Sequence, residues 1–138
     1  MKRVNWLLGI LLIFSTLQLS ACGSKPKMAE KVQPVQLEPI DGTDLKRVIL
    51  TEKAAERIDI QTVLVQGGAV PYAAVIYDTE GNTWVYTNPE PLTFVRQPIV
   101  IDRIEGDQAI LSEGLEPGTS VVTVGVAELY GAETGVSK

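Results

Sequence analysis

The pattern of apolar and polar residues predicts a chain built mostly of short strands. In the stretch 70–129, β-branched and aromatic residues alternate with turns rich in glycine, proline, asparagine and aspartate. The expected strands are 70–77, 82–87, 92–104, 108–112 and 120–124, with the longest kinked at Pro98. Tight turns are expected at 78–81, 105–107 and 113–118, and the two prolines of 88–91 are expected to end a strand. This stretch therefore predicts a small antiparallel β module.

Upstream of that stretch, the sequence predicts a strand at 45–50 and a short helix at 51–57. Thr51 can cap the free N–H groups of this helix, Glu52 suits its positive N-terminal end, and Arg57 suits its C-terminal end. The whole domain is thus expected to be mainly β: a small antiparallel barrel or sandwich of about six to eight strands with one short helix.

In residues 58–65, apolar and polar side chains alternate at first, and the last positions are all apolar. This pattern predicts a strand that is half-buried at its start and more buried at its end. One face of this strand would carry Ile58, Ile60, Thr62 and Leu64. The pair Gly67-Gly68 would join it directly to the central stretch, so that both parts build one module. For residues 125–131 the pattern fits a last strand and a helical turn equally well.

The first residues carry the most specific signal in the chain. Lys2 and Arg3 precede an apolar run that is too short to span a bilayer comfortably, and Leu19-Ser20-Ala21 precedes Cys22. This arrangement resembles the bacterial lipoprotein signal, in which the cysteine is lipidated. We therefore expect a signal peptide at 1–21 and a lipid anchor on Cys22. A flexible tether is expected at 22–44, the β domain at 45–131 and a tail at 132–138.

Composition excludes several classes of function. The 138 residues suffice for one small domain and a leader, and the net charge of −5 argues against a nucleic-acid surface. The chain has no histidine, which excludes Ser–His and Cys–His catalysis and imidazole metal sites. Cys22 is the single cysteine, so no intramolecular disulfide can form. We expect no enzyme activity, no catalytic residue, no metal site and no cofactor.

Acidic and aromatic residues are the remaining candidates for a site. Acidic residues gather at the expected turns, and the spacing of Asp78, Glu80 and Asn82 is faintly similar to a calcium loop, but the glycine and the distal glutamate of that motif are absent. We interpret these residues as surface turn residues. Arg96 and Arg103 are expected in ordinary surface ion pairs. The aromatic residues are expected in the core rather than on a stacking platform: Tyr72, Tyr77, Trp84, Tyr86 and Phe94.

Several short motifs occur in an order that resembles one protein family. They are Val70-Pro71 with Ala74-Val75, Trp84-Val85-Tyr86, Phe94-Val95-Arg96, Gly114-Leu115 before Gly118, and Val121-Val122 before Gly125. Their order is similar to the C-terminal part of the periplasmic adaptor subunits, or membrane-fusion proteins, of resistance–nodulation–division efflux pumps. The run 58–62 is similar to the opening segment of the heavy-metal branch, although that branch has glycine where this chain has Asp59. The lipoyl domain and helical hairpin of the family are missing here.

The resemblance implies a membrane-proximal module without the hairpin that reaches the outer-membrane channel. We therefore expect a lipid-anchored, non-catalytic accessory module of a membrane transport (efflux) assembly that acts by protein–protein contact. Its partners would be the membrane, through the lipid, and a membrane transporter or another envelope protein, with no nucleic acid. It would reside in the bacterial cell envelope, facing the periplasm or the cell exterior. The alternative is a stand-alone envelope lipoprotein that binds a small ligand or a cell-wall component through its aromatic strand face.

Overall fold

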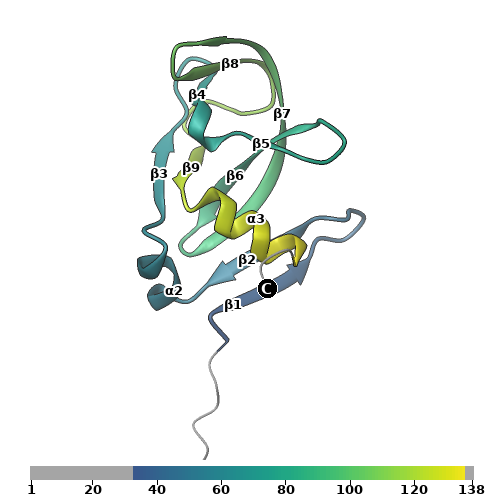
Figure 1. Cartoon of the computed structure of the whole chain (residues 1–138), viewed down its shortest axis with the longest axis vertical. Coiled ribbons are helices and arrows are strands. Elements are labelled where there is room, and N and C mark those ends of the chain that lie inside the picture. The colour runs from purple at the N-terminus through teal and green to yellow at the C-terminus, as the bar shows by residue number, and fades with distance from the viewer. Residues whose placement is uncertain (1–32, 136–138) are drawn as a thin grey trace, which may run out of the picture. The chain divides into compact units, whose positions relative to one another are not determined.

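Nine antiparallel strands and two α-helices make up residues 33–135, the part of the chain that the structure, a computed structural model, describes (Figure 1). The elements are β1 (Val35–Pro39), β2 (Lys46–Leu50), α2 (Glu52–Arg57), β3 (Gln61–Leu64), β4 (Ala69–Pro71), a 3-10 turn η1 (Tyr72–Ala74), β5 (Ile76–Tyr77), β6 (Thr83–Glu90), β7 (Thr93–Glu105), β8 (Gln108–Glu113), β9 (Ser120–Val124) and α3 (Val126–Thr134). The predicted signal peptide at 1–21, the lipidation of Cys22 and the last three residues of the tail lie outside the described residues.

The strands pair in the order β1-β2-β7-β6-β9-β3, with β5 added to β6, and with β8 joining β7 to β4. The sheet does not close on itself, so the mainly-β, sandwich-like prediction is confirmed and a closed barrel is not formed. The count of nine strands exceeds the six to eight expected, and the described residues hold two α-helices rather than one. Both the upstream and the central stretch contribute strands to this sheet, because β2 pairs with β7 and β3 pairs with β9.

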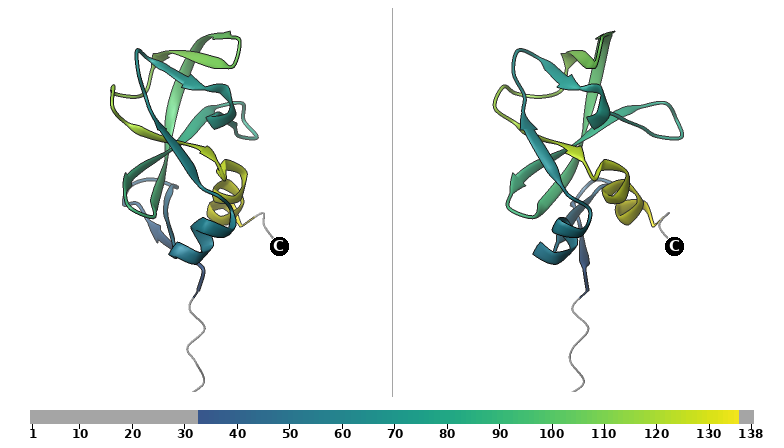
Figure 2. Two further views of the ribbon diagram at one scale, coloured as in Figure 1. Left: turned by 90° about the vertical axis from the view of Figure 1, so that its left-hand side faces the viewer. Right: turned by 60° about the vertical axis from the view of Figure 1, so that its left-hand side comes forward.

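Two hydrophobic cores lie on opposite faces of the central strands. Adjacent residues of a strand point to opposite faces, and Val85 and Tyr86 of β6, like Val121 and Val122 of β9, are all fully buried. The helix-side core contains Val48, Leu50, Ile76, Tyr86, Phe94, Val122 and Leu129. The hairpin-side core contains Val65, Val70, Ala74, Val85, Ile99, Ala109 and Val121. Figure 2 shows α2, α3, β1 and β2 gathered at one end, away from the β7–β8 hairpin.

The predicted helix forms where its sequence signals place it. The Thr51 hydroxyl accepts a hydrogen bond from the backbone N–H of Ala54 at 3.2 Å, and Glu52 and Arg57 occupy the first and last turns. Ala54 and Ala55 pack against the helix-side core. The short helix is therefore held by its cap and by its apolar face together, since six residues are too few to be stable alone.

The single strand predicted at 70–77 is wrong. The chain leaves β8 after Pro71, makes the 3-10 turn η1, and pairs with β6 only from Ile76. The N–H of Tyr72 donates to the carbonyl of Asp107 at 2.7 Å, and the N–H of Val75 donates to Tyr72 at 3.0 Å. The turn is needed because the segment changes its partner strand from β8 to β6.

The strand break predicted at 88–91 is also wrong, because β6 continues to Glu90 across a bulge. The Asn88 amide donates to the carbonyls of Glu90 at 2.7 Å and Thr93 at 2.9 Å. These side-chain bonds hold the hairpin together next to Pro89, which has no N–H to contribute. The reversal falls instead at Leu92, whose φ is +59°.

Both ends of the predicted β domain extend further than expected. Residues 35–39, assigned to the tether, form β1 and pair along their whole length with β2. Residues 126–131 form helix after the N-cap Gly125, and α3 continues to Thr134 in what was predicted to be a tail. The tail prediction is wrong there because Glu133 is buried, only 3% exposed.

The strand predicted at 58–65 is shorter and less buried than expected. Ile58 and Ile60 pack against the helix-side core and Val65 is buried, as the alternation indicated. Leu64, however, is 62% exposed, and every residue of β3 is exposed. The prediction of burial at the end of the strand is wrong for Leu64 because β3 lies at the edge of the sheet order.

Gly125, at the start of α3, is predicted to tolerate no side chain. Its φ is +88°, and an added Cβ would lie 2.5 Å from Cδ1 of Ile60. Gly125→Ala should lower the free energy of unfolding by about 1–3 kcal/mol more than Gly81→Ala does, measured by chemical denaturation, because Ile60 must shift to admit the added methyl group. Gly81→Ala is the control, because Gly81 has a φ of +87° with open space around it. Equal losses of unfolding free energy for the two variants would show that the Ile60 side chain moves aside without an energetic penalty.

Candidate functional site

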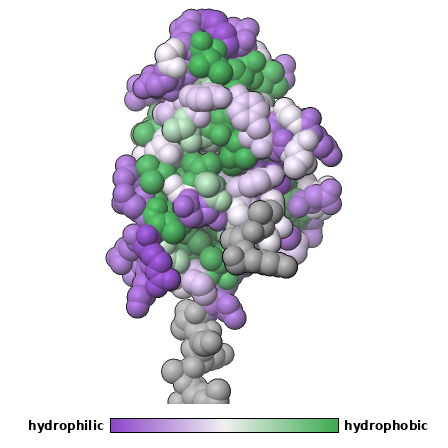
Figure 3. Space-filling view, viewed as in Figure 1, coloured by the Kyte–Doolittle hydropathy of each residue, from purple (hydrophilic) through white to green (hydrophobic). Residues whose placement is uncertain are grey.

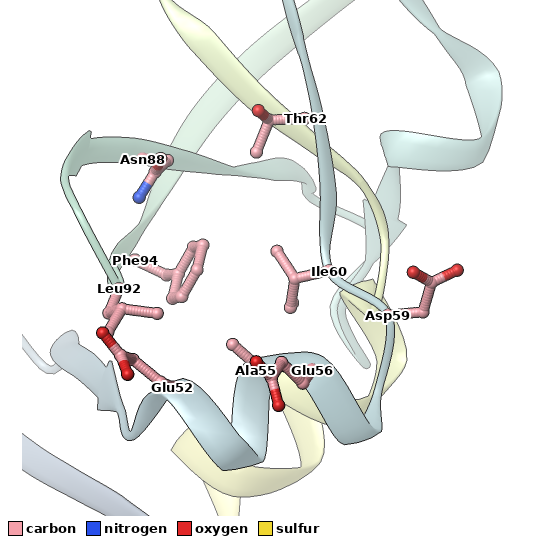
Figure 4. A pocket seen from close by; sticks show the side chains of 9 residues that line it. All are labelled: Glu52, Ala55, Glu56, Asp59, Ile60, Thr62, Asn88, Leu92 and Phe94. Atoms are coloured by element: carbon pink, nitrogen blue, oxygen red, sulfur yellow. The ribbon is translucent and has the colours of Figure 1, made fainter.

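An open groove lies between α2, the start of β3 and the turn that joins β6 to β7 (Figure 4). Its volume is about 580 Å³, and we call it the α2 groove. It is lined by Glu52, Ala55, Glu56, Asp59, Ile60, Thr62, Asn88, Leu92 and Phe94. Figure 4 shows Phe94 and Ile60 facing each other across it, with Ala55 below them, whereas the carboxylate of Asp59 is turned outward. The groove therefore has an apolar floor and carboxylates at its margin.

The sequence of α2 sorts its charges onto two sides. Glu52 and Glu56 are four residues apart and both line the groove, whereas Lys53 and Arg57 line a separate hollow with Pro34 and Thr51. No Lys or Arg of residues 33–135 lies within 4.0 Å of the two glutamate carboxylates. The groove side of the helix thus presents two carboxylates without a cationic partner in the described part of the chain.

Two backbone reversals shape the groove walls. Asp59 and Leu92 have φ values of +50° and +59°, and they are the non-glycine residues with positive φ in the described residues. Aspartate tolerates this conformation, but for a bulky residue such as leucine it is an outlier. The N–H of Leu50 donates to the carbonyl of Leu92 at 2.9 Å, which fixes that wall to β2. The groove is therefore built into the fold rather than formed by a loose loop.

A buried carboxylate, Glu133 of α3, forms a second cluster of polar groups. The Tyr86 hydroxyl donates to its Oε2, and the N–H of Lys46 donates to Oε1 at 3.2 Å. Arg96 Nη2 donates to Oε1 at 3.4 Å, while Arg96 Nε lies 3.2 Å from Oε2 without the alignment of a hydrogen bond. The Lys46 ammonium also donates to the Glu133 carbonyl at 3.3 Å. These contacts connect α3 to β2, β6 and β7.

Arg96 is covered by aromatic rings. Its guanidinium carbon lies 4.6 Å from the centre of the Trp84 ring and 5.5 Å from that of Tyr130, and its side chain is 12% exposed. The prediction of a surface ion pair is therefore wrong for Arg96. It is confirmed for Arg103, which is exposed and pairs with Asp102 and Glu105 at 2.6 Å.

The Glu133 cluster connects structural elements, and its phenol and carboxylate are both buried. Burial, and next the hydrogen bond to Glu133, raises the pKa of the Tyr86 phenol above its ordinary value of 10.0. The raised pKa is consistent with the Tyr86 hydroxyl acting as donor to the Glu133 carboxylate. Within residues 33–135, no group of three or more Cys, Asp or Glu side chains has the arrangement of a metal site.

The acidic turn at Asp78 is occupied by its own hydrogen bonds. Asp78 Oδ1 accepts from the N–H groups of Glu80 at 2.9 Å and Asn82 at 2.8 Å. Oδ2 accepts from the Asn82 amide at 2.9 Å and from Trp84 Nε1 at 3.0 Å. The Asn82 and Trp84 bonds lower the pKa of Asp78 from 3.8 to about 2. The interpretation of this group as turn residues is confirmed.

The aromatic residues divide between core and surface. Tyr86 and Phe94 are buried and Trp84 is half-buried, as predicted. Tyr72 and Tyr77 are 42% and 50% exposed, so the core prediction is wrong for them. The pKa of Tyr77 is raised, first by a hydrogen bond with Tyr72. They are exposed because they lie on η1 and on the two-residue strand β5, where the chain changes its partner strand.

Sequence reasoning missed both the groove and the Glu133 cluster. The four-residue spacing of Glu52 and Glu56 was visible in the sequence, but Leu92 and Phe94 reach the groove only through the β6–β7 turn. Glu133 lay in the predicted tail, and nothing near it in sequence indicates Tyr86 or Arg96 as partners. The candidate site residue Cys22 lies outside the described residues.

Comparison of the chain with models of known protein families, with curated proteins and with solved structures gave no match. Among the helices of residues 33–135, none has the length and apolar character needed to cross a membrane.

Replacing Glu133 by alanine should strongly destabilise the domain, because it leaves the buried Arg96 without its counter-charge. The expected loss is about 3–5 kcal/mol in the free energy of unfolding, measured by denaturation. Glu128→Ala, an exposed glutamate of the same helix, is the matched control and should change stability by less than about 0.5 kcal/mol. Similar small losses for both would contradict the role of Glu133 in holding α3.

Acidification should weaken the Asp78 turn. The folded-state pKa of about 2 lies below the ordinary 3.8, so the stabilising contribution is present above the ordinary value and is lost as the pH falls from 3.8 towards 2. In a Trp6→Phe background, Trp84 fluorescence should show a step in that pH window, because its indole N–H loses the carboxylate. Adding Asp78→Asn should remove the step, and a step that persists would assign the titration to another group.

Proposed function

We propose that the chain is a lipid-anchored, non-catalytic accessory module of a membrane transport assembly, acting by protein–protein contact. Cys22 would hold it at the membrane of a bacterial cell envelope, with the β domain facing the periplasm or the cell exterior. The lipoprotein-like leader and the order of motifs similar to efflux-pump adaptors support this proposal from the sequence.

The observation that carries the proposal is the α2 groove. Protein-binding surfaces combine an apolar centre with a polar rim, and the groove has Phe94, Ile60 and Leu92 beside the carboxylates of Glu52 and Glu56. In the space-filling view, hydrophilic residues cover the α2 corner and apolar residues are exposed above it (Figure 3). Such a surface suits contact with a protein better than it suits chemistry on a small substrate.

The charge of the domain supports a lipid anchor as the means of attachment. Residues 33–135 carry 6 lysines and arginines against 16 aspartates and glutamates, a formal charge of −10. An anionic lipid surface attracts basic segments and repels a domain of this charge. On this proposal the acyl chains hold the module at the membrane, and the domain surface is left for the partner.

The anchor is tested by Cys22→Ser. This variant should leave the membrane fraction or remain uncleaved on its leader, because no thiol is available for acylation. Fractionation and mass spectrometry of the N-terminus measure both outcomes. A variant that stays membrane-bound and is cleaved normally after Ala21 would contradict the anchor.

The protein contact is tested by photo-crosslinking in intact cells. A photo-reactive residue in place of Glu56 should give an adduct with a membrane protein, identified by mass spectrometry. The control replaces Asp107, which is exposed on the β7–β8 turn at the far end of the domain, and should give no such adduct (Figure 1). Absence of a protein adduct from position 56 would favour the stand-alone ligand-binding alternative.

A further inference from the structure

The exposed edge of β3 continues from the α2 groove. β3 pairs with β9 and with no other strand of the described residues, and it ends the sheet order. Thr62 belongs both to this strand and to the groove lining, and Ile60 precedes the strand in the same lining. Groove and edge thus form one continuous surface.

The hydrogen bonds of Val65 show which backbone groups of β3 face outward. Its N–H donates to the carbonyl of Thr119 at 2.8 Å, and its carbonyl accepts from Gly118 at 2.9 Å, so Val65 faces the β9 side. Backbone groups of an antiparallel strand alternate between its two sides. By this alternation the N–H and C=O groups of Thr62 and Leu64 point away from β9. They are available to an added strand.

Leu64 continues the apolar surface of the groove along this edge. Because alternate residues share a face, Leu64 lies on the same face as Thr62, and it is 62% exposed. An extended segment placed beside β3 would therefore lay alternate side chains over Leu64 and then over the groove floor at Ile60 and Phe94. An isolated edge of this kind, exposed and apolar, is a template for strand pairing.

The negative charge at the groove margin indicates which charge a segment bound beside β3 should carry. Glu52 and Glu56 stand at the groove margin without a cation of the described residues beside them, and the described domain carries a formal charge of −10. Opposite charge across an interface speeds association and excludes partners of the same sign. A basic segment fits this margin, whereas an acidic one is repelled.

We propose that the edge of β3 and the α2 groove together bind an extended, basic segment of a partner protein, which adds a strand to the sheet and seats an apolar side chain on Ile60 and Phe94. This inference rests on the proposed protein-binding function and specifies the partner's chemistry. Since β3 has four residues, the paired length is short, roughly 13 Å.

The test measures binding of synthetic peptides to the full mature chain in detergent by fluorescence anisotropy. The probe is a blocked heptapeptide with the sequence Lys-Val-Lys-Leu-Lys-Val-Lys, and its control has glutamate in place of every lysine. The lysine peptide should bind with an affinity that falls as salt is added, and the glutamate peptide should not bind. No binding of the lysine peptide at about 1 mM would overturn the inference.

Peptide N-methylation separates strand pairing from mere charge attraction. Two further probes carry N-methyl groups on the odd or on the even residues of the same heptapeptide. If the peptide pairs with β3, methylation of one set should abolish binding and methylation of the other should leave it, because only alternate N–H groups face β3. Equal effects of the two patterns would overturn the assignment.

Charge reversal locates the site without touching the core. The double variant Glu52→Lys and Glu56→Lys should weaken binding of the lysine peptide by about tenfold or more. Asp107→Lys with Glu105→Lys reverses the same charge on the distant β7–β8 turn and should have little effect. Equal weakening by both pairs would show that overall charge, and not the groove, attracts the peptide.

Other occupants of the surface give different results. A dimer of the chain at working concentration, dissociated by the lysine peptide, would assign the edge to a second copy and overturn the partner assignment. A second variant changes Lys25, Lys27 and Lys31 to glutamine. If this variant binds the peptide more tightly, the groove belongs to the chain's own N-terminal segment, and the partner assignment is again overturned. A photo-adduct from position 56 together with no peptide binding would keep the proposed function and reject this inference.

Discussion

Burial of the central strands on both faces is the constraint on which the rest of the structure depends. Val85 and Tyr86 of β6 are adjacent and fully buried, and so are Val121 and Val122 of β9. A strand with no exposed face needs a covering layer on each side. The hairpin-side layer comes from β4, η1 and β8. The helix-side layer comes from β1, β2, α2 and α3, which lie at the two ends of the described chain. Neither end can therefore be dispensable to the fold.

The helix-side layer includes a polar element that an apolar core would not need. Glu133 brings a carboxylate between Tyr86, Arg96 and the N–H of Lys46. Because a buried charge is tolerated only when its partners surround it, this arrangement admits one placement of α3 and penalises others. The rings of Trp84 and Tyr130 cover the Arg96 guanidinium, and the Arg96 side chain is only 12% exposed. The cluster thus ties the last helix to β2, β6 and β7.

The same construction leaves one border of the sheet uncovered. β1 ends the sheet order at one side, where Leu37 is 40% exposed beside Gln36, Glu38 and Pro39. β3 ends it at the other side, with Val63 and Leu64 exposed. Natural sheets usually protect such edges with charge, proline or a covering segment. Here the charge next to the strand is Asp59, whose carboxylate accepts a hydrogen bond from the Gln61 side chain at 2.9 Å, and the α2 carboxylates Glu52 and Glu56 border the groove. The edge and the groove together are the surface that we propose binds a partner protein.

Local signals in the sequence determined the mainly-β fold, the turns at Asp78 and Gly106, and the helix capped by Thr51, because each depends on residues within a few positions of one another. Tertiary contacts decided the rest. The stretch 70–77 divides because it must change partner strands, and residues 35–39 become a strand because β2 offers them an edge. Tyr86, Arg96 and Glu133 contact one another although they belong to three different elements, β6, β7 and α3. Leu92 and Phe94, from the β6–β7 turn and β7, line the groove together with residues of α2. Contacts between residues so far apart leave no periodicity in the sequence, so only the folded chain shows them.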